Sequence, residues 1–429
     1  MKRSIYQSLV DWKHSDRRKP LILRGARQVG KTYLLKQFAK NEYKNYVYVN
    51  FEDNSKISAA LKEELGAKKI IEYLGILSGK KILPHKTLII FDEIQSSPQI
   101  LKSLKYFNED LNEYHIATAG SLLGIALAGA KSFPVGKVNF LNMYPLSFSE
   151  FLTAQKKDML LSVLPDILHG AKAIPEVFHV ELLELLKKYC FVGGMPEVVA
   201  DYIKHHDFGR VRDIQIELLR SYSNDFAKHT SKGEALKIKQ IWDSIPLHLS
   251  KENHTFVFSA IKHSARAREY ETALQWLYDA GLIIKIPCIS KPLIPLNAYT
   301  EKAFKVYLCD VGLLGAMTKL KQETIAYGND LFTHFKGALI ENYAIQELNP
   351  KLDLYYWASR GKAEVDLILN IGDKIYPLEI KSGVNLKAKS LKRYDELYNP
   401  TRLLRCSLAN LNTSGKLTDI PLFALAKLF

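Results

Sequence analysis

The fold of the first part of the chain is decided by residues 25–32, which read Gly25-Ala26-Arg27-Gln28-Val29-Gly30-Lys31-Thr32. The glycines let backbone N–H groups turn inward toward an anion, because no Cβ blocks the approach. An apolar run precedes this loop at 21–23, and a helical pattern follows over 31–40. A strand, a glycine-containing loop and a helix in this order predict a phosphate-binding loop, with the positive end of the helix directed at the anion.

The loop pattern predicts ATP with Mg²⁺ as the ligand, lined by all eight loop residues. We expect Lys31 to neutralise the β- and γ-phosphates and the Thr32 hydroxyl to bind magnesium. Ser121 lies further along the chain, in Ala-Thr-Ala-Gly-Ser. Its hydroxyl either contacts the γ-phosphate or caps a turn.

Two acidic residues end the buried-strand run at 87–92 and continue beyond it. The carboxyl ends of parallel strands face the ligand crevice, so Asp92 and Glu93 are placed near the phosphates. We expect Asp92 to hold the magnesium ion, directly or through water. We expect Glu93 to orient and deprotonate the attacking water.

Length and composition set wider bounds. The chain has 429 residues, which suggests two to four domains. Its net charge of +15 suits a polyanionic partner such as DNA, although a generically basic protein would show the same balance. Four widely spaced cysteines argue against a zinc site or a disulfide framework. We expect a cytoplasmic protein, since the sequence has neither a secretory signal nor an apolar run of about 18–20 residues.

Hydrophobic periodicity changes along the chain. The first 150 residues alternate strand-like and helical patterns, which predicts an α/β fold with a parallel sheet covered on both faces. Residues 150–230 read mainly as helices. The element order of a winged helix follows, with helical patterns at 235–249, 256–263 and 267–280 and strand-like runs at 282–286 and 304–308. The last hundred residues give helices at 332–348 and 386–397 and strand-like runs at 354–358, 365–369, 375–380 and 402–406.

The spacing of acidic residues in the last hundred residues of the chain indicates a candidate metal site. A hairpin of the runs at 365–369 and 375–380 would bring Asp366 beside Glu379. Glu379 and Lys381 share a face, because side chains alternate along a strand. Asp366 and Glu379 could then hold one Mg²⁺, with Lys381 near the same water or phosphate and Glu341 completing the shell from a helix.

Four motifs together resemble those of prokaryotic AAA+-type ATPases that carry an uncharacterised carboxyl-terminal domain. They are Arg24–Thr32, Phe-Asp-Glu-Ile-Gln95, Ala-Gly-Ser121 and Tyr-Pro-Leu-Ser-Phe-Ser-Glu-Phe151. The resemblance covers essentially the whole chain and implies an AAA+ core with strand order 5-1-4-3-2. It implies four domains: an AAA+ P-loop ATPase core (1–150), a helical lid (151–232), a winged helix (233–325) and an α/β nuclease-like domain (326–429).

The acidic residues also resemble the PD-(D/E)xK nuclease core, with Glu341 as the helix glutamate, Asp366 as the strand aspartate and Glu379-x-Lys381 after it. Val365 stands where the nominal motif has proline. The resemblance implies a metal-dependent endonuclease. The alternatives are a nuclease fold that only binds, or a solvated charged face.

One departure from the ATPase family concerns an arginine. Gly136-Lys137 stands where relatives have Gly-Arg. Lysine supplies charge but not the planar fork of arginine, so ATP hydrolysis is less secure than ATP binding. Arg210, Arg212 and Arg220 are equal candidates to replace it.

Basic residues at Lys262, His263, Arg266 and Arg268 flank the expected recognition helix, where phosphate contacts usually fall. The leading hypothesis is therefore a magnesium-dependent ATPase that acts on DNA. The alternative is a nucleotide-controlled signalling or scaffold switch that binds a protein partner and has an inert nuclease fold. A ring-forming motor is a third hypothesis, and a homo-oligomer is compatible with each.

Overall fold

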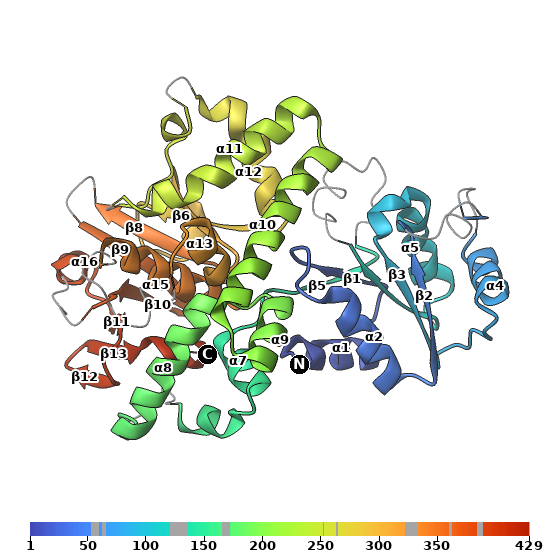
Figure 1. The fold of residues 1–429 in the computed structure, drawn as a ribbon, viewed down its shortest axis with the longest axis horizontal. Coiled ribbons are helices and arrows are strands. Elements are labelled where there is room, and N and C mark those ends of the chain that lie inside the picture. The colour runs from blue at the N-terminus through green and yellow to red at the C-terminus, as the bar shows by residue number, and fades with distance from the viewer. Residues whose placement is uncertain are drawn as a thin grey trace. The chain divides into compact units, whose positions relative to one another are not determined.

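The computed structural model describes residues 1–52, 60–61, 66–120, 136–164, 172–251, 253–262, 265–321, 333–359, 363–383 and 389–428. Internal contacts divide the chain into two compact units. The N-terminal unit comprises Lys2–Tyr144 and Asp279–Gly281, and the C-terminal unit comprises Pro145–Tyr278 and Leu282–Phe429. Figure 1 labels most of their helices and strands.

A parallel sheet forms the centre of the N-terminal unit. Its five strands in the described residues lie in the order β2-β3-β4-β1-β5, and every pairing is parallel. The expected order 5-1-4-3-2 is therefore confirmed. The strands are β1 (Leu21–Arg24), β2 (Asn45–Asn50), β3 (Thr87–Asp92), β4 (His115–Ala119) and β5 (Asn139–Asn142).

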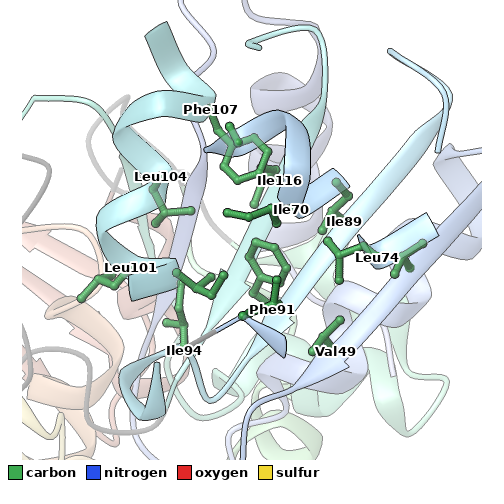
Figure 2. Close-up of a cluster of buried hydrophobic side chains, with 14 of the residues drawn as sticks. Val49, Ile70, Leu74, Ile89, Phe91, Ile94, Leu101, Leu104, Phe107 and Ile116 are labelled. Carbon is green, nitrogen blue, oxygen red and sulfur yellow. The ribbon is translucent and has the colours of Figure 1, made fainter. Parts of the chain in front are cut away.

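Helices cover both faces of this sheet, because the strands are apolar on both sides. All six residues of β3 are buried. Ile89 and Phe91 on one face join a cluster with α4 and α5, which Figure 2 shows. On the other face α2 packs through Leu34, Leu35 and Phe38, and α1 lies against it. The helices are α1 (Ile5–His14), α2 (Lys31–Glu42), α4 (Ala67–Ser78), η1 (Ile94–Ser96) and α5 (Pro98–Asp110).

The first part of the C-terminal unit is helical, as expected. Its first helix begins at a capping box, in which Ser147 and Glu150 each accept a hydrogen bond from the other's backbone N–H. The break between α8 and α9 requires glycine, since a Cβ on Gly194 would lie 2.1 Å from Leu146 O. The helices are α7 (Phe148–Ala154), η2 (Asp158–Val163), α8 (Glu176–Val192), α9 (Pro196–His205), α10 (Phe208–His229), α11 (Lys232–Leu249), η3 (Phe258–Ala260), α12 (Ala267–Asp279) and α13 (Val311–Met317).

A mixed sheet occupies the rest of the C-terminal unit. Eight described strands lie in the order β12-β13-β11-β10-β9-β8-β6-β7. The strands are β6 (Ile283–Ile289), β7 (Thr300–Leu308), β8 (Tyr355–Ser359), β9 (Ala363–Ile371), β10 (Lys374–Ile380), β11 (Leu403–Ser407), β12 (Asn412–Ser414) and β13 (Leu417–Pro421). The remaining helical elements are η4 (Leu296–Tyr299), α15 (Thr333–Leu348), α16 (Lys389–Tyr398) and η6 (Leu422–Lys427).

This sheet crosses the expected domain boundary at residues 325–326. Strand β6 of the expected winged helix pairs in parallel with β8, in the register Cys288↔Tyr356. Only a 3-10 turn, η3, forms within 256–262, so the helix expected at 256–263 is wrong for that described part. The hairpin β6–β7 and the strands of the expected nuclease-like domain therefore share one sheet.

Helix α15 ties this sheet to distant segments through buried polar side chains. Asn342 accepts a hydrogen bond from Leu308 N (2.9 Å) and donates one to Leu308 O (3.1 Å). Glu347, 4% exposed, accepts one from Phe148 N at 2.7 Å. Tyr356 and Trp357 are 1% exposed, so these aromatic residues pack in the core. Among the described helices, none is both long and apolar enough to span a bilayer.

Candidate functional site

The loop at 25–32 lies between β1 and α2 and has the backbone that its glycines predict. Gly25, Gln28 and Gly30 have φ values of 145°, 64° and 95°. A Cβ on Gly25 would lie 2.0 Å from Met143 O, so the close approach of this neighbouring segment requires glycine. With these backbone angles, the N–H groups of the loop can face an anion that lies in front of the N-terminus of α2.

The other loop residues contribute mainly backbone groups. Ala26 and Val29 are 2% and 0% exposed, so their side chains pack inside the unit. Val29 O accepts a hydrogen bond from the Arg3 side chain at 3.1 Å, which anchors the loop to the start of the chain. Arg27 is half-buried, and it lowers the pKa of Lys31 through charge repulsion.

Lys31 is folded into the loop and is 7% exposed. Its Nζ donates hydrogen bonds to Gly25 O and Ala26 O, each at 2.8 Å. Burial lowers the pKa of Lys31 to about 8, partly opposed by the carboxylates of Glu93 and Asp92. An anion in the loop would favour the charged lysine, as a phosphate-binding role requires.

Thr32 and Asp92 lie together at the carboxyl edge of the parallel sheet. The Thr32 hydroxyl donates to Asp92 Oδ2 at 2.7 Å, and the Tyr48 hydroxyl donates to the same oxygen at 2.9 Å. Asp92 is 4% exposed. A hydroxyl and a carboxylate are hard oxygen donors, so this pair fits Mg²⁺ beside the phosphates.

Glu93 follows Asp92 with a backbone that is unusual for its residue type. Its φ is 49°, in the left-handed region, which costs a non-glycine residue roughly 1–2 kcal/mol. Gln95 Nε2 donates to Glu93 Oε2 at 2.6 Å. Strain of this kind often accompanies functional sites, and the turn fixes where the carboxylate can point. Ser121, the other expected nucleotide contact, lies outside the described residues.

The candidate arginines differ in their environment, which the sequence could not reveal. Arg210 forms a two-point ion pair with Asp201, at 2.6 and 3.0 Å. Arg212 is half-buried, donates to Leu320 O at 2.8 Å, and has its pKa lowered to about 10 by burial. Arg220 is exposed on α10.

Lys137, at the position where the resemblance implies arginine, has its Nζ 2.9 Å from Glu109 Oε1 on α5. An exposed pair of this type contributes little stability.

The C-terminal sheet brings together three of the expected site residues, Asp366, Glu379 and Lys381. The β9–β10 register pairs Leu367 with Leu378, so continuing it by one residue sets Asp366 opposite Glu379. Lys381 Nζ lies 2.5 Å from Glu379 Oε1. The backbone N–H of Ile380 donates to Asp366 Oδ2 at 2.7 Å, which fixes the orientation of that carboxylate.

This group fits a cation by two observations. Glu379 is 5% exposed, and its Oε2 has no hydrogen-bond partner among the described residues. Burial raises the pKa of Asp366, and the nearby Glu341 and Glu379 raise it further against the opposing charge of Lys305. Both carboxylates would be stabilised by a positive ion.

Glu341 belongs to a different set of contacts. It accepts hydrogen bonds from Tyr307 (2.5 Å) and Lys305 (3.3 Å) on Oε1, and its Oε2 lies 2.6 Å from His254 Nδ1. Although burial opposes ionisation, Lys305 and then His254 and Tyr307 lower the pKa of Glu341. Within the described ranges, no three His, Cys, Asp or Glu side chains are grouped to hold a metal ion. The expected shell of three carboxylates is therefore not assembled there, because Glu341 is already engaged.

Lys305 is a functional candidate that the sequence did not single out. It is 1% exposed on β7, and its Nζ lies 2.6 Å from Glu364 Oε1. A lysine inside the apolar run 304–308 was the available signal, since lysine is almost never fully buried without a partner.

Comparison with known protein families gives matches to three successive parts of the chain. Residues 17–152 match the family described as AAA domain. Residues 183–324 and 336–423 match two domains of unknown function, DUF8612 and DUF4143. The part of the chain that matches an AAA domain is therefore the part that contains the phosphate-binding loop and the parallel five-stranded sheet described above.

Similar whole proteins add little about function. The uncharacterized protein MJ1544 of Methanocaldococcus jannaschii is 28% identical over 411 residues, which span 89% of this chain and 79% of the relative. The Walker-type ATPase PABY2304 of Pyrococcus abyssi is 14% identical with a TM-score of 0.46, over 74% of this chain and 95% of that one. The ORC1 protein of Aeropyrum pernix, solved in complex with DNA, is 14% identical with a TM-score of 0.28, over 74% and 90% of the two chains.

Proposed function

We propose that this chain is a magnesium-dependent ATPase that acts on DNA and whose C-terminal unit contains a PD-(D/E)xK-like phosphodiesterase centre. One observation carries the proposal: Asp366 on β9 and Glu379 on β10 lie together with Lys381, just after β10, in a chain whose residues 17–152 match an AAA domain. Two carboxylates with a lysine suit metal-assisted attack on a phosphodiester.

In the ATPase site, the loop backbone and Lys31 bind the phosphates, and Thr32 with Asp92 would hold Mg²⁺. The ion supplies positive charge to the phosphate oxygens when it is bound. Glu93 orients the attacking water and accepts its proton. Among the three candidate arginines, Arg220 is the preferred one for supporting ATP hydrolysis, because Arg210 and Arg212 already serve partners in their own unit.

In the C-terminal centre, Asp366 and Glu379 would hold one Mg²⁺, which supplies Lewis acidity toward the phosphodiester. Lys381, half-buried beside Glu379, stabilises the charge that develops on the phosphate or lowers the pKa of the attacking water. Glu341 acts through its neighbours in this proposal, because its oxygens are occupied by the contacts described above.

DNA as the target is supported by charge on exposed elements. Lys262, Arg266 and Arg268 are exposed at and before the start of α12, the helix expected to read DNA. His263 lies outside the described residues. Removal of one cation that binds a DNA phosphate should reduce the slope of log affinity against log salt by about 1, so Arg266→Ala and Arg268→Ala test this surface.

The ATPase proposal is tested by hydrolysis rates with and without DNA. We expect DNA to increase the rate and Glu93→Gln to abolish turnover while ATP still binds. Glu72→Gln, which changes an exposed glutamate on α4, is the matched control. A rate that responds neither to DNA nor to Glu93→Gln would refute the proposal.

The C-terminal proposal is tested by nicking of supercoiled, linear and branched DNA with Mg²⁺ or Mn²⁺. We expect cleavage that Asp366→Ala and Lys381→Ala abolish, whereas Asp373→Asn at the exposed β9–β10 turn retains it. The absence of cleavage would exclude the nuclease activity and leave the ATPase proposal standing.

A second function is favoured by the engagement of Glu341 in internal contacts. The chain would then be a nucleotide-controlled switch, with a C-terminal unit that binds a protein partner and does not cleave DNA. Nucleotide-dependent binding of a protein together with absent DNA binding at low salt would support this alternative, because electrostatic binding to DNA is strongest there.

A further inference from the structure

Lys305 forms the centre of a second charged group beside Asp366 and Glu379. Its buried Nζ lies 2.6 Å from Glu364 Oε1 and 3.3 Å from Glu341 Oε1. Tyr307, on the same face of β7 two residues along, donates to Glu341 at 2.5 Å. One ammonium group therefore serves two carboxylates at a place that solvent barely reaches.

The neighbouring group, Lys381 with Glu379, also pairs a lysine with a carboxylate, but it differs in the hydrogen bonding of one carboxylate oxygen. Lys381 is 30% exposed on its side chain and pairs with Glu379. Glu379 Oε2, in contrast, is buried and has no hydrogen-bond partner in the part of the chain that the structure describes. An acceptor that could still take a ligand is therefore found in the Lys381 group, whereas Glu341 has both oxygens engaged.

The charge balance of the Lys305 group and the Lys381 group together indicates how many metal ions they can bind. Four acidic side chains, Glu341, Glu364, Asp366 and Glu379, face two lysines among the described residues, and His254 beside Glu341 adds a third positive charge when it is protonated. Buried charge needs compensation, and one divalent cation is enough for an excess of one or two negative charges. A second divalent cation would reverse the balance or displace Lys305, which is 1% exposed and held by two partners.

We propose that Lys305 is a built-in cation that takes the place of a second metal ion, so the centre binds a single divalent cation through Asp366 and Glu379 and not through Glu341. This inference rests on the proposed function, in which those two carboxylates hold a metal. Lys305 is a positioning residue, since its burial keeps it from the substrate. It fixes Glu341 and Glu364 as internal partners of β7.

The test counts Mn²⁺ bound to the full chain without nucleotide, by electron paramagnetic resonance of free Mn²⁺ and by calorimetry. Ions bound elsewhere are removed by subtracting the count for Asp366→Asn. We expect a difference of one Mn²⁺. Glu379→Gln should weaken this binding by more than about 100-fold, whereas Glu341→Gln should weaken it by no more than the about 10–100-fold that is typical of outer-shell changes.

Lys305→Met adds an independent measurement. Removal of the ammonium leaves Glu364 without its lysine and leaves Glu341 with His254 alone, so the variant should gain one Mn²⁺. Lys302→Met, on the exposed part of the same strand, should keep the wild-type count. The Glu341→Gln comparison carries the test by itself where Lys305→Met does not fold.

The outcomes separate this inference from the proposed function. A difference of two Mn²⁺, or equal weakening in Glu341→Gln and Glu379→Gln, would overturn the single-cation assignment while the metal centre remained. A folded Lys305→Met variant that binds one Mn²⁺ would overturn the role of Lys305. If Asp366→Asn removes no Mn²⁺, the inference and the proposed metal centre both fail, and the ATPase assignment is untouched.

Discussion

Replacement of Glu347 by glutamine should stabilise the C-terminal unit at neutral and alkaline pH. Burial raises the pKa of Glu347 from its ordinary value of 4.5 to about 7, with hydrogen bonds from Phe148 N and Tyr189 opposing the rise. Between these two values the folded state keeps a proton that the unfolded chain releases. Unfolding therefore becomes easier as pH rises from about 4.5 to about 7, and the stability given by the protonated form is lost above that range.

The size of the effect follows from the change in pKa. A difference of about 2.5 in pKa corresponds to at most about 3 kcal/mol, at about 1.4 kcal/mol for each pH unit. Glu347→Gln removes the titration, and its amide oxygen can still accept from Phe148 N. The variant should exceed the wild type by up to about 3 kcal/mol at pH 8 and by only a few tenths near pH 4.5.

The assay is urea unfolding followed by tryptophan fluorescence at several pH values. Trp12 is the one tryptophan of the N-terminal unit, so a Trp12→Phe background restricts the signal to Trp242, Trp276 and Trp357 in the C-terminal unit. Glu301→Gln, at an exposed position on β7, is the control and should show no such pH dependence. A Glu347→Gln advantage that stays constant with pH, or a variant less stable at pH 8, would refute the reasoning.

Three further predictions concern single side chains. Gly25→Ala should abolish ATP binding and destabilise the N-terminal unit. The control Gly79→Ala shares a positive φ, but its Cβ would meet nothing within 4 Å, so it should cost only about 1–2 kcal/mol in thermal or urea unfolding. Equal costs of the two substitutions would contradict the argument that a close backbone approach requires glycine at position 25. Arg405→Met should cost about 3–5 kcal/mol in urea unfolding of the C-terminal unit, because it leaves the buried carboxylate of Asp419 without its two-point partner; a decrease below 1 kcal/mol would contradict this. Arg220→Ala should slow ATP hydrolysis at least about tenfold with unchanged ATP affinity, and an unchanged steady-state rate would remove this arginine from consideration.

Much of the N-terminal unit could be predicted because its signals are local. The strand, loop and helix around residues 25–32 follow one another in the chain, and the backbone conformations at Gly25 and Gly30 are those that glycine permits. The run at 87–92 is buried as a whole, which predicts a central parallel strand. Strand β5 was harder to predict, because Asn139–Asn142 alternates polar and apolar residues at the edge of the sheet.

In the C-terminal unit, the sequence predicted a local hairpin but not the pairing of strands that are distant in the chain. A hairpin over 365–380 was predictable because its strands are adjacent in the chain and alternate with period two. The pairing of β6 with β8 was not, because Cys288 and Tyr356 are 68 positions apart in the chain and no local pattern selects a partner strand.

The sequence by itself determined the phosphate-binding loop, the acids that follow β3, and the spacing of Asp366, Glu379 and Lys381. These features depend on backbone freedom and on residues close in the chain. Tertiary structure alone decided that Glu341 contacts Lys305 and His254, since the ionic state of a buried carboxylate depends on neighbours that only folding brings near. The same reason separates the candidate arginines: Arg210 and Arg212 differ from Arg220 through partners contributed by other segments.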